Sequence, residues 1–148
     1  MESPTNPVRF TAADWHYRDG TQCAVVLDTT HRIGLILSGT DSTVQAFIVG
    51  TPEIPFVADH GAIIVGDELD NVYALYTHSY DVMDTGMSSR TGGSQVIVQP
   101  AQYNPPDAPF DRNSVGRSAK FGADPQGRIT EYHVGAYTAV HDAHDCYS

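Results

Sequence analysis

A chain of 148 residues, of which 41% are hydrophobic, has the length and composition of one folded domain rather than of a disordered segment. Its formal net charge of -10 argues against partners such as nucleic acid or an anionic membrane, since both require clustered Lys and Arg. No apolar run approaches the roughly 18 residues that cross a bilayer, and no signal peptide is visible, so we expect a soluble protein.

The first 20 residues predict an extended N-terminal arm that leads into the folded part. They contain two prolines and show no hydrophobic period. Val8, Arg9 and Phe10 follow these prolines. Val8 and Phe10 offer apolar anchors, and the extended backbone could add to an exposed sheet edge.

From residue 21 onward the pattern becomes that of β-strands. Residues 22–28 and 32–37 are short, rich in branched side chains and separated by the polar sequence TTH, which predicts a hairpin. Residues 43–50 alternate in polarity with the period of a half-buried strand. Pro52 and Pro55 then end regular pairing, because proline cannot donate a hydrogen bond to a neighbouring strand.

The second half of the chain continues in the same way. We expect strands over 71–82, 94–100, 115–122 and 128–137, the last two joined by the turn sequence ADPQG. No window carries a helical stripe. The predicted fold class is therefore all-β, a small single-domain β-barrel or sandwich of about seven to nine strands within residues 21–140.

Three stretches fall outside this strand pattern. Residues 84–93 are flexible by composition, and residues 100–114 form a long loop with four prolines. Residues 141–148 are expected to form a flexible C-terminal tail. Long loops of this kind in a compact domain are typical of contact surfaces or mobile segments.

The sequence VADHGAIIVGDELD (57–70) is the first candidate for chemistry. Its ionisable side chains could form a metal or acid/base site: Asp59, His60, Asp67, Glu68 and Asp70. It lacks the alternating acidic spacing of a calcium loop, however, and no further ligands converge on it. We interpret Ala62 to Val65 as a buried strand, with Asp59 and His60 as its entry turn and Gly66-Asp67 as its exit turn.

Metal and nucleophile signals elsewhere are weak. His141 and His144 stand three residues apart near the C-terminus, but a structural zinc site needs a second pair of ligands. Cys23 lies in an apolar run and Cys146 near the end of the chain, too few for a disulfide scaffold. No nucleophile elbow, phosphate-binding loop or dinucleotide fingerprint is present. We expect no catalytic residue, no metal and no cofactor.

Aromatic residues fall largely on the expected strands or just before them: Trp15, Tyr17, Tyr73, Tyr76, Tyr80, Tyr132 and Tyr137. Tyrosines in these places could line a barrel cavity and bind an apolar ligand. More often, tyrosines on β-strands are cross-strand packing partners.

Four glycine-containing segments follow one another along the strand map: GLILSG (34–39), FIVG (47–50), GAIIVGD (61–67) and VGRSAKF (115–121). Together with the arm, their order resembles that of viral head decoration proteins, the group of lambda-type capsid stabilisers and their relatives in tailed viruses. The resemblance covers about half of the chain. The stretch 77–114 is longer than the compact domain of that family needs, which suggests an added contact loop.

The resemblance implies that Gly61, Gly66, Asp67 and Gly116 define the turns of the fold. It also implies a non-enzymatic virion structural protein, made in the host cytoplasm, that sits on the capsid surface as a homotrimer. Its partner would be the major capsid protein, bound through Val8, Arg9 and Phe10 of the N-terminal arm, with no role for nucleic acid or membrane.

The residues leave two other functions open. One is a small β-barrel cyclase or ligand-binding protein with a tyrosine-lined cavity. The other is an inhibitor or immunity-type protein whose acidic face masks a basic partner.

Overall fold

The computed structural model describes residues 9–10, 14–18, 21–38, 43–58, 61–77, 80–88, 91–99, 117–136 and 140. Several residues and segments singled out in the sequence lie outside this set: Val8, Asp59, His60, Gly116, Tyr137, His141, His144, Cys146, the loop 100–114 and the tail 141–148. The described residues contain no helix long and apolar enough to span a bilayer.

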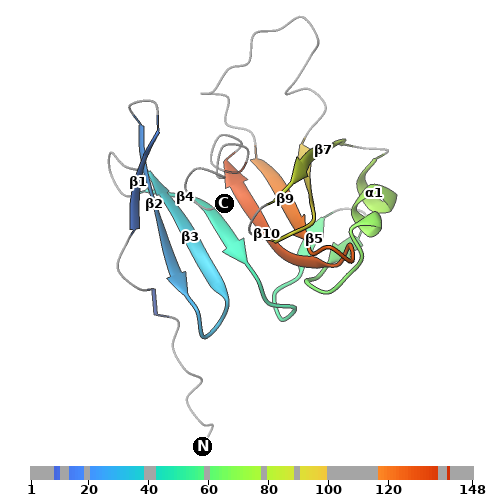
Figure 1. The fold of residues 1–148 in the computed structure, drawn as a ribbon, viewed down its shortest axis with the longest axis horizontal. Coiled ribbons are helices and arrows are strands. Elements are labelled where there is room, and N and C mark those ends of the chain that lie inside the picture. The colour runs from blue at the N-terminus through green and yellow to red at the C-terminus, as the bar shows by residue number, and fades with distance from the viewer. Residues whose placement is uncertain are drawn as a thin grey trace, which may run out of the picture.

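The described part is built from short strands and one short helix. In chain order they are β1 (Asp14–Arg18), β2 (Thr21–Asp28), β3 (Ile33–Ser38), β4 (Val44–Val49), β5 (Phe56–Ala58), β6 (Gly61–Ile63), α1 (Asp70–Tyr76), β7 (Asp81–Met87), β8 (Ser94–Gln99), β9 (Arg117–Ala123) and β10 (Ile129–Ala136). Eight strands form one antiparallel sheet in the order β1-β2-β3-β4-β10-β9-β8-β7 (Figure 1). The strands β5 and β6 form a separate hairpin.

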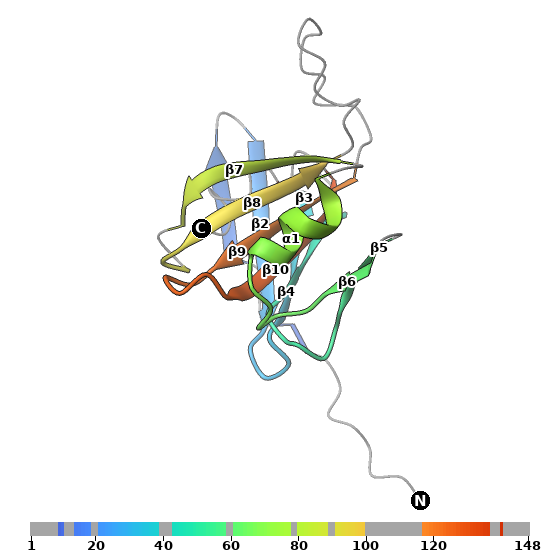
Figure 2. The same ribbon diagram turned by 90° about the vertical axis from the view of Figure 1, so that its right-hand side faces the viewer.

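The fold is mainly β, as expected, but the large sheet is not a closed barrel. Among the described strands, β1 and β7 each pair on one side only, so the sheet has two edges. Figure 2 shows that its twist turns β7–β10 steeply away from the direction of β2 and β3. The strands curve around a core without meeting at their edges.

The main core lies between the β8–β10 part of the sheet and the elements that cover it. Figure 2 shows α1 lying across this part of the sheet, with the β5–β6 hairpin beside it. Val72 and Tyr76 of α1 and Ile63 of β6 are buried against Phe121 and Tyr132 of the sheet. Burial of this apolar surface is the main force that holds the helix and hairpin in place.

Aromatic rings connect the β5–β6 hairpin to the sheet. The ring of Phe56 meets those of Tyr76, Phe121 and Tyr132 edge to face, with centroids 6.0, 5.3 and 5.7 Å apart. The Tyr132 hydroxyl donates a hydrogen bond to the carbonyl oxygen of Ile54 at 2.8 Å. Burial raises the pKa of Tyr132 to about 12, so the hydroxyl keeps the proton that it donates.

The predicted strand over residues 71–82 is wrong, because Asp70–Tyr76 forms α1 and β7 begins only at Asp81. Val72 and Tyr76, four residues apart, are buried, whereas Ala74 between them is exposed. The alternation of Val72, Ala74 and Tyr76 that indicated a strand is therefore incidental. The spacing of four, which places side chains on one face of a helix, is the one that matters.

Two predicted boundaries also differ from the structure. Residues 84–87, expected in a flexible loop, belong to β7, and a turn closed by a 2.8 Å hydrogen bond from Ser88 N–H to the Gly93 carbonyl leads into β8. A bulge between Asp84 and Gly86 breaks the alternation that would have indicated this strand. Asp14–Arg18, expected in the arm, forms the edge strand β1.

The segment 57–70 contains the expected exit turn at Gly66-Asp67 but not the expected buried strand, and the expected entry turn at Asp59 and His60 lies outside the described residues. In β6 only Ile63 is buried, while Ala62 and the following Ile64 are exposed, so the interpretation of Ala62 to Val65 as core is wrong. The physical reason is that β6 pairs only with β5, and one face of this small hairpin is open to solvent.

The Gly66-Asp67 turn is fixed on both sides. Gly66 has a φ of 104°, a conformation that favours glycine, and the Asp67 carboxylate accepts the Ile64 N–H at 2.9 Å. Gly61 also has a positive φ, of 147°. Backbone hydrogen bonds of 2.8 Å join Gly66 N–H to the Ile129 carbonyl and Ile129 N–H to the Asp67 carbonyl. The turn is thereby attached to the start of β10.

Candidate functional site

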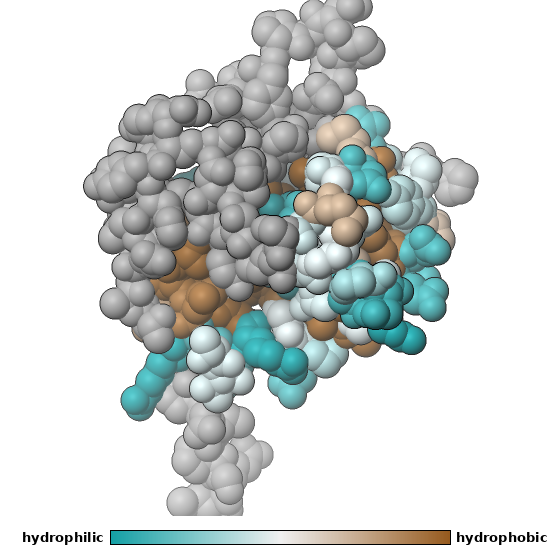
Figure 3. Space-filling view, in the orientation of Figure 1, coloured by the Kyte–Doolittle hydropathy of each residue, from teal (hydrophilic) through white to brown (hydrophobic). Residues whose placement is uncertain are grey.

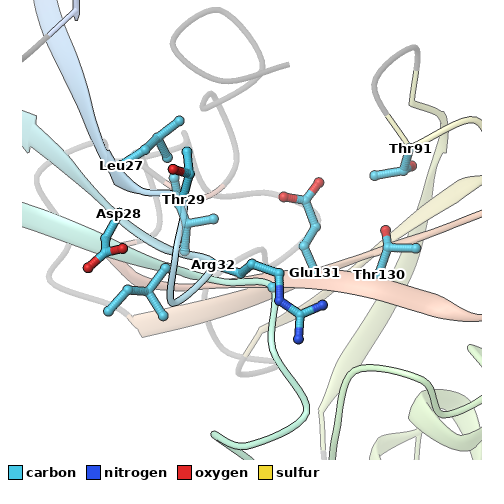
Figure 4. Close-up of a pocket in the computed structure, with 10 residues that line it drawn as sticks. Leu27, Asp28, Thr29, Arg32, Thr91, Thr130 and Glu131 are labelled. Atoms are coloured by element: carbon cyan, nitrogen blue, oxygen red, sulfur yellow. The ribbon is translucent and has the colours of Figure 1, made fainter. Parts of the chain in front are cut away.

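A cleft opens beside the turn that joins β2 to β3. Its volume is about 480 Å³, within the range of pockets that hold small molecules. In the described part its lining combines aliphatic, hydroxyl and charged groups: Leu27, Ile33, Ile48, Gly50, Thr29, Thr91, Thr130, Asp28, Arg32 and Glu131. Figure 4 shows Leu27, Asp28 and Thr29 on one side, Thr91 and Thr130 on the other, and Arg32 and Glu131 between them. Figure 3 shows apolar surface over the neighbouring strands β2 and β3.

Arg32 ends the β2–β3 turn in a strained conformation. Its φ is 56°, the only positive value at a non-glycine residue among those described, and this region costs an L-residue about 1–2 kcal/mol. A 2.7 Å hydrogen bond from Gly50 N–H to the Arg32 carbonyl holds the turn there. Within the described part its guanidinium has no hydrogen bond or ion pair, and in Figure 4 it points away from the Glu131 carboxylate.

Glu131 belongs to a buried row of ionisable groups on the sheet face opposite the main core. Glu131 is only 7% exposed, and its Oε2 atom lies 3.3 Å from Nε2 of the buried His133. Lys120, also buried, stands directly opposite His133 on β9, and Ile48 and Ile97 flank the pair in the same cross-strand row. A buried charge is costly unless it has a partner. The carboxylate of Glu131, the imidazole of His133 and the amine of Lys120 lie on the same face, where they can be partners of one another.

Asp28 connects the N-terminal segment to the cleft. Its carboxylate accepts the His31 N–H at 3.0 Å and the Arg9 N–H at 2.8 Å, and it lies 2.8 Å from His31 Nδ1. The hydrogen bond from the His31 backbone lowers the pKa of Asp28 from 3.8 to about 2, with the Arg9 backbone adding to it against the opposing effect of burial. Of the residues expected to contact a partner, Arg9 therefore binds its own domain through its backbone, and Phe10 is exposed.

Stability should fall more steeply in acid for the wild type than for Asp28→Asn. A folded pKa below the unfolded value means that the ionised carboxylate stabilises the fold above pH 3.8, and that this contribution is lost between pH 3.8 and about 2. Thermal unfolding of both proteins across this pH range measures the difference in their stability. The other carboxylates are present in both proteins, so their contributions cancel in this difference. Parallel curves for the two proteins would contradict the role of the Asp28 hydrogen bonds.

A second candidate surface lies on the same sheet face as the main core. One cross-strand row is apolar over seven strands: Val26, Leu35, Phe47, Val134, Ala119, Val98 and Val82. At β8 and β9 the row is covered, but Phe47 on β4 is 55% exposed. On the same strand Val44 is 42% exposed. Val44 pairs with Leu37 of β3, and Phe47 pairs with Leu35. We call Leu35, Leu37, Val44 and Phe47 the β3–β4 patch; none of them belongs to either buried cluster.

The sequence-predicted candidates do not gather at the cleft. The Asp67 carboxylate accepts the Ile64 N–H of its own turn, Glu68 forms an isolated backbone β-bridge with Arg128, and Asp70 lies in the first turn of α1. The described residues hold no group of three or more His, Cys, Asp or Glu placed to bind a metal ion. Among the described residues that line the cleft there is no tyrosine.

The cleft residues were missed in the sequence, although two signals were present. The turn sequence TTHR has an arginine where the backbone prefers glycine. In EYHV (131–134), polar and apolar residues alternate as in a strand with one solvated face, yet both Glu131 and His133 are buried. The pairing of β10 with β4 and β9 places His133 between Ile48 and Lys120 in the middle of the sheet.

No family model, curated protein or solved structure matches this chain. Its function is therefore inferred from the site geometry.

Proposed function

We propose that this chain is a non-enzymatic assembly protein that docks on another protein through the β3–β4 patch. The observation that carries the proposal is the exposure of Phe47 in a row that is buried farther along the sheet. Contiguous exposed apolar side chains on a protein surface are typical of contact sites. A large aromatic ring at such a place supplies much of the binding free energy of an interface.

The partner that we propose is the major capsid protein of a tailed virus, with this chain as a capsid decoration protein, assembled as a trimer on the virion surface. The order of its glycine-containing segments supports this more specific function. A net charge of -10 would keep decorated particles from associating with one another.

Phe47→Ala should weaken docking about 10-fold or more while the domain stays folded, because an exposed ring contributes to an interface and little to the core. The measurement is the occupancy of the protein on capsid shells of its own virus, by cryo-electron microscopy, together with its oligomeric state in solution. Met87→Ala is the matched control, since Met87 is 73% exposed at the end of β7, outside the patch.

Two results would count against this function. If the wild-type protein stays monomeric and absent from the shells, the capsid role is wrong. If Phe47→Ala and Met87→Ala dock equally well, the β3–β4 patch is not the contact surface.

A further inference from the structure

We infer that the cleft beside the β2–β3 turn binds an amphipathic organic acid with an aliphatic chain of medium length. This goes beyond assembly, because it assigns a small-molecule site to the sheet face opposite the β3–β4 patch.

The charges of the lining favour an anion. The carboxylate of Asp28 is taken up by His31 and Arg9, and that of Glu131 lies against His133. Arg32 is the one charged residue of the described lining with no partner in the described part. A guanidinium binds a carboxylate through two parallel hydrogen bonds, which makes an acid the best match.

The backbone of Arg32 supports the same conclusion. At a φ of 56° glycine would be free of strain, whereas arginine is not. A non-glycine residue kept at a position where glycine would be less strained supports a functional role for its side chain. Since the Arg32 side chain stabilises no neighbour in the described part, the cleft is the place where its charge can act.

The rest of the lining describes the ligand further. Leu27, Ile33 and Ile48 form an aliphatic wall that suits a hydrocarbon chain. On the other side, Thr91 and Thr130 line the cleft. A volume of about 480 Å³ holds about sixteen waters, so it accommodates a chain of several carbons.

The test is titration calorimetry of the full chain with three eight-carbon probes: octanoate, 3-hydroxyoctanoate and octylamine. The net charge of -10 attracts cations everywhere on the surface, so a preference for the acids must come from a local positive group. We expect saturable one-site binding of octanoate and of 3-hydroxyoctanoate, and binding of octylamine at least about 10-fold weaker than that of either acid.

Arg32→Gly separates binding from folding, because it removes the guanidinium and the strain together. We expect it to bind both acids about 10-fold or more weakly, with a melting temperature equal to or above that of the wild type. Arg32→Lys, which keeps a cation, should retain more of the affinity.

The inference is overturned by any of three results: octylamine binding as tightly as the acids, no saturable binding of either acid, or unchanged acid binding by Arg32→Gly. None of these results bears on the docking of Phe47, so this inference and the proposed function stand or fall separately.

Discussion

Phe121→Ala should lower the free energy of unfolding by about 3–5 kcal/mol, which is enough to leave a domain of ordinary stability largely unfolded on mild heating. Phe121 is fully buried on β9, where its ring meets that of Phe56 edge to face and lies 5.9 Å from that of Tyr132. Its removal leaves a cavity beneath α1 and the β5–β6 hairpin. Because the Phe121 ring connects the β5–β6 hairpin to the sheet, we expect the hairpin to detach at a lower urea concentration in this variant than in the wild type.

Phe47→Ala is the matched control for this measurement. It deletes the same ring from the same sheet face, but from a residue that is 55% exposed, so we expect a loss below about 1 kcal/mol. If both variants lost several kcal/mol, the β3–β4 patch would be covered in the free protein. If both lost less than about 1 kcal/mol, Phe121 would not be a centre of the core.

Gly93→Ala should destabilise the domain by about 3 kcal/mol or more, although it adds a single methyl group. A Cβ at this position would lie 2.1 Å from the carbonyl oxygen of Asp124 and 2.5 Å from that of Ala123. Both are backbone atoms at the end of β9, so no side-chain rotation relieves the overlap. The β7–β8 turn would have to separate from the sheet, which thermal unfolding and near-UV circular dichroism would detect.

Gly66→Ala is the informative comparison. Gly66 has a positive φ but no atom within 4 Å of an added Cβ, so only the conformational cost of about 1–2 kcal/mol remains. If Gly93→Ala proved no worse than Gly66→Ala, the close approach of the two turns would be absent in solution.

The elements that local chemistry determines were predictable. The hairpin of β2 and β3 follows from two branched runs around a polar turn, and that of β9 and β10 follows from the ADPQG turn. The helix α1 was not, because seven residues give a stripe of only Val72 and Tyr76. The edge strand β7 was hidden by the bulge at Gly86.

The candidate site was the least predictable part, for a physical reason. The cleft joins the β2–β3 turn, the end of β4, Thr91 and the start of β10. These come together only because β4 pairs with β10 across more than half of the chain. No local pattern encodes that pairing, so neither the burial of Glu131 nor the exposure of Phe47 could be read from the residues around them.

Lys120 is the only lysine of the chain, and it is 4% exposed on β9. Its place beside His133 in the middle of the sheet shields the ε-amine from reagents in solution. Acylating agents and enzymes that modify lysine can reach this amine only when β9 leaves its neighbours. Modification at Lys120 would therefore mark molecules that have opened, and the intact domain presents arginine as its side-chain cation to any partner.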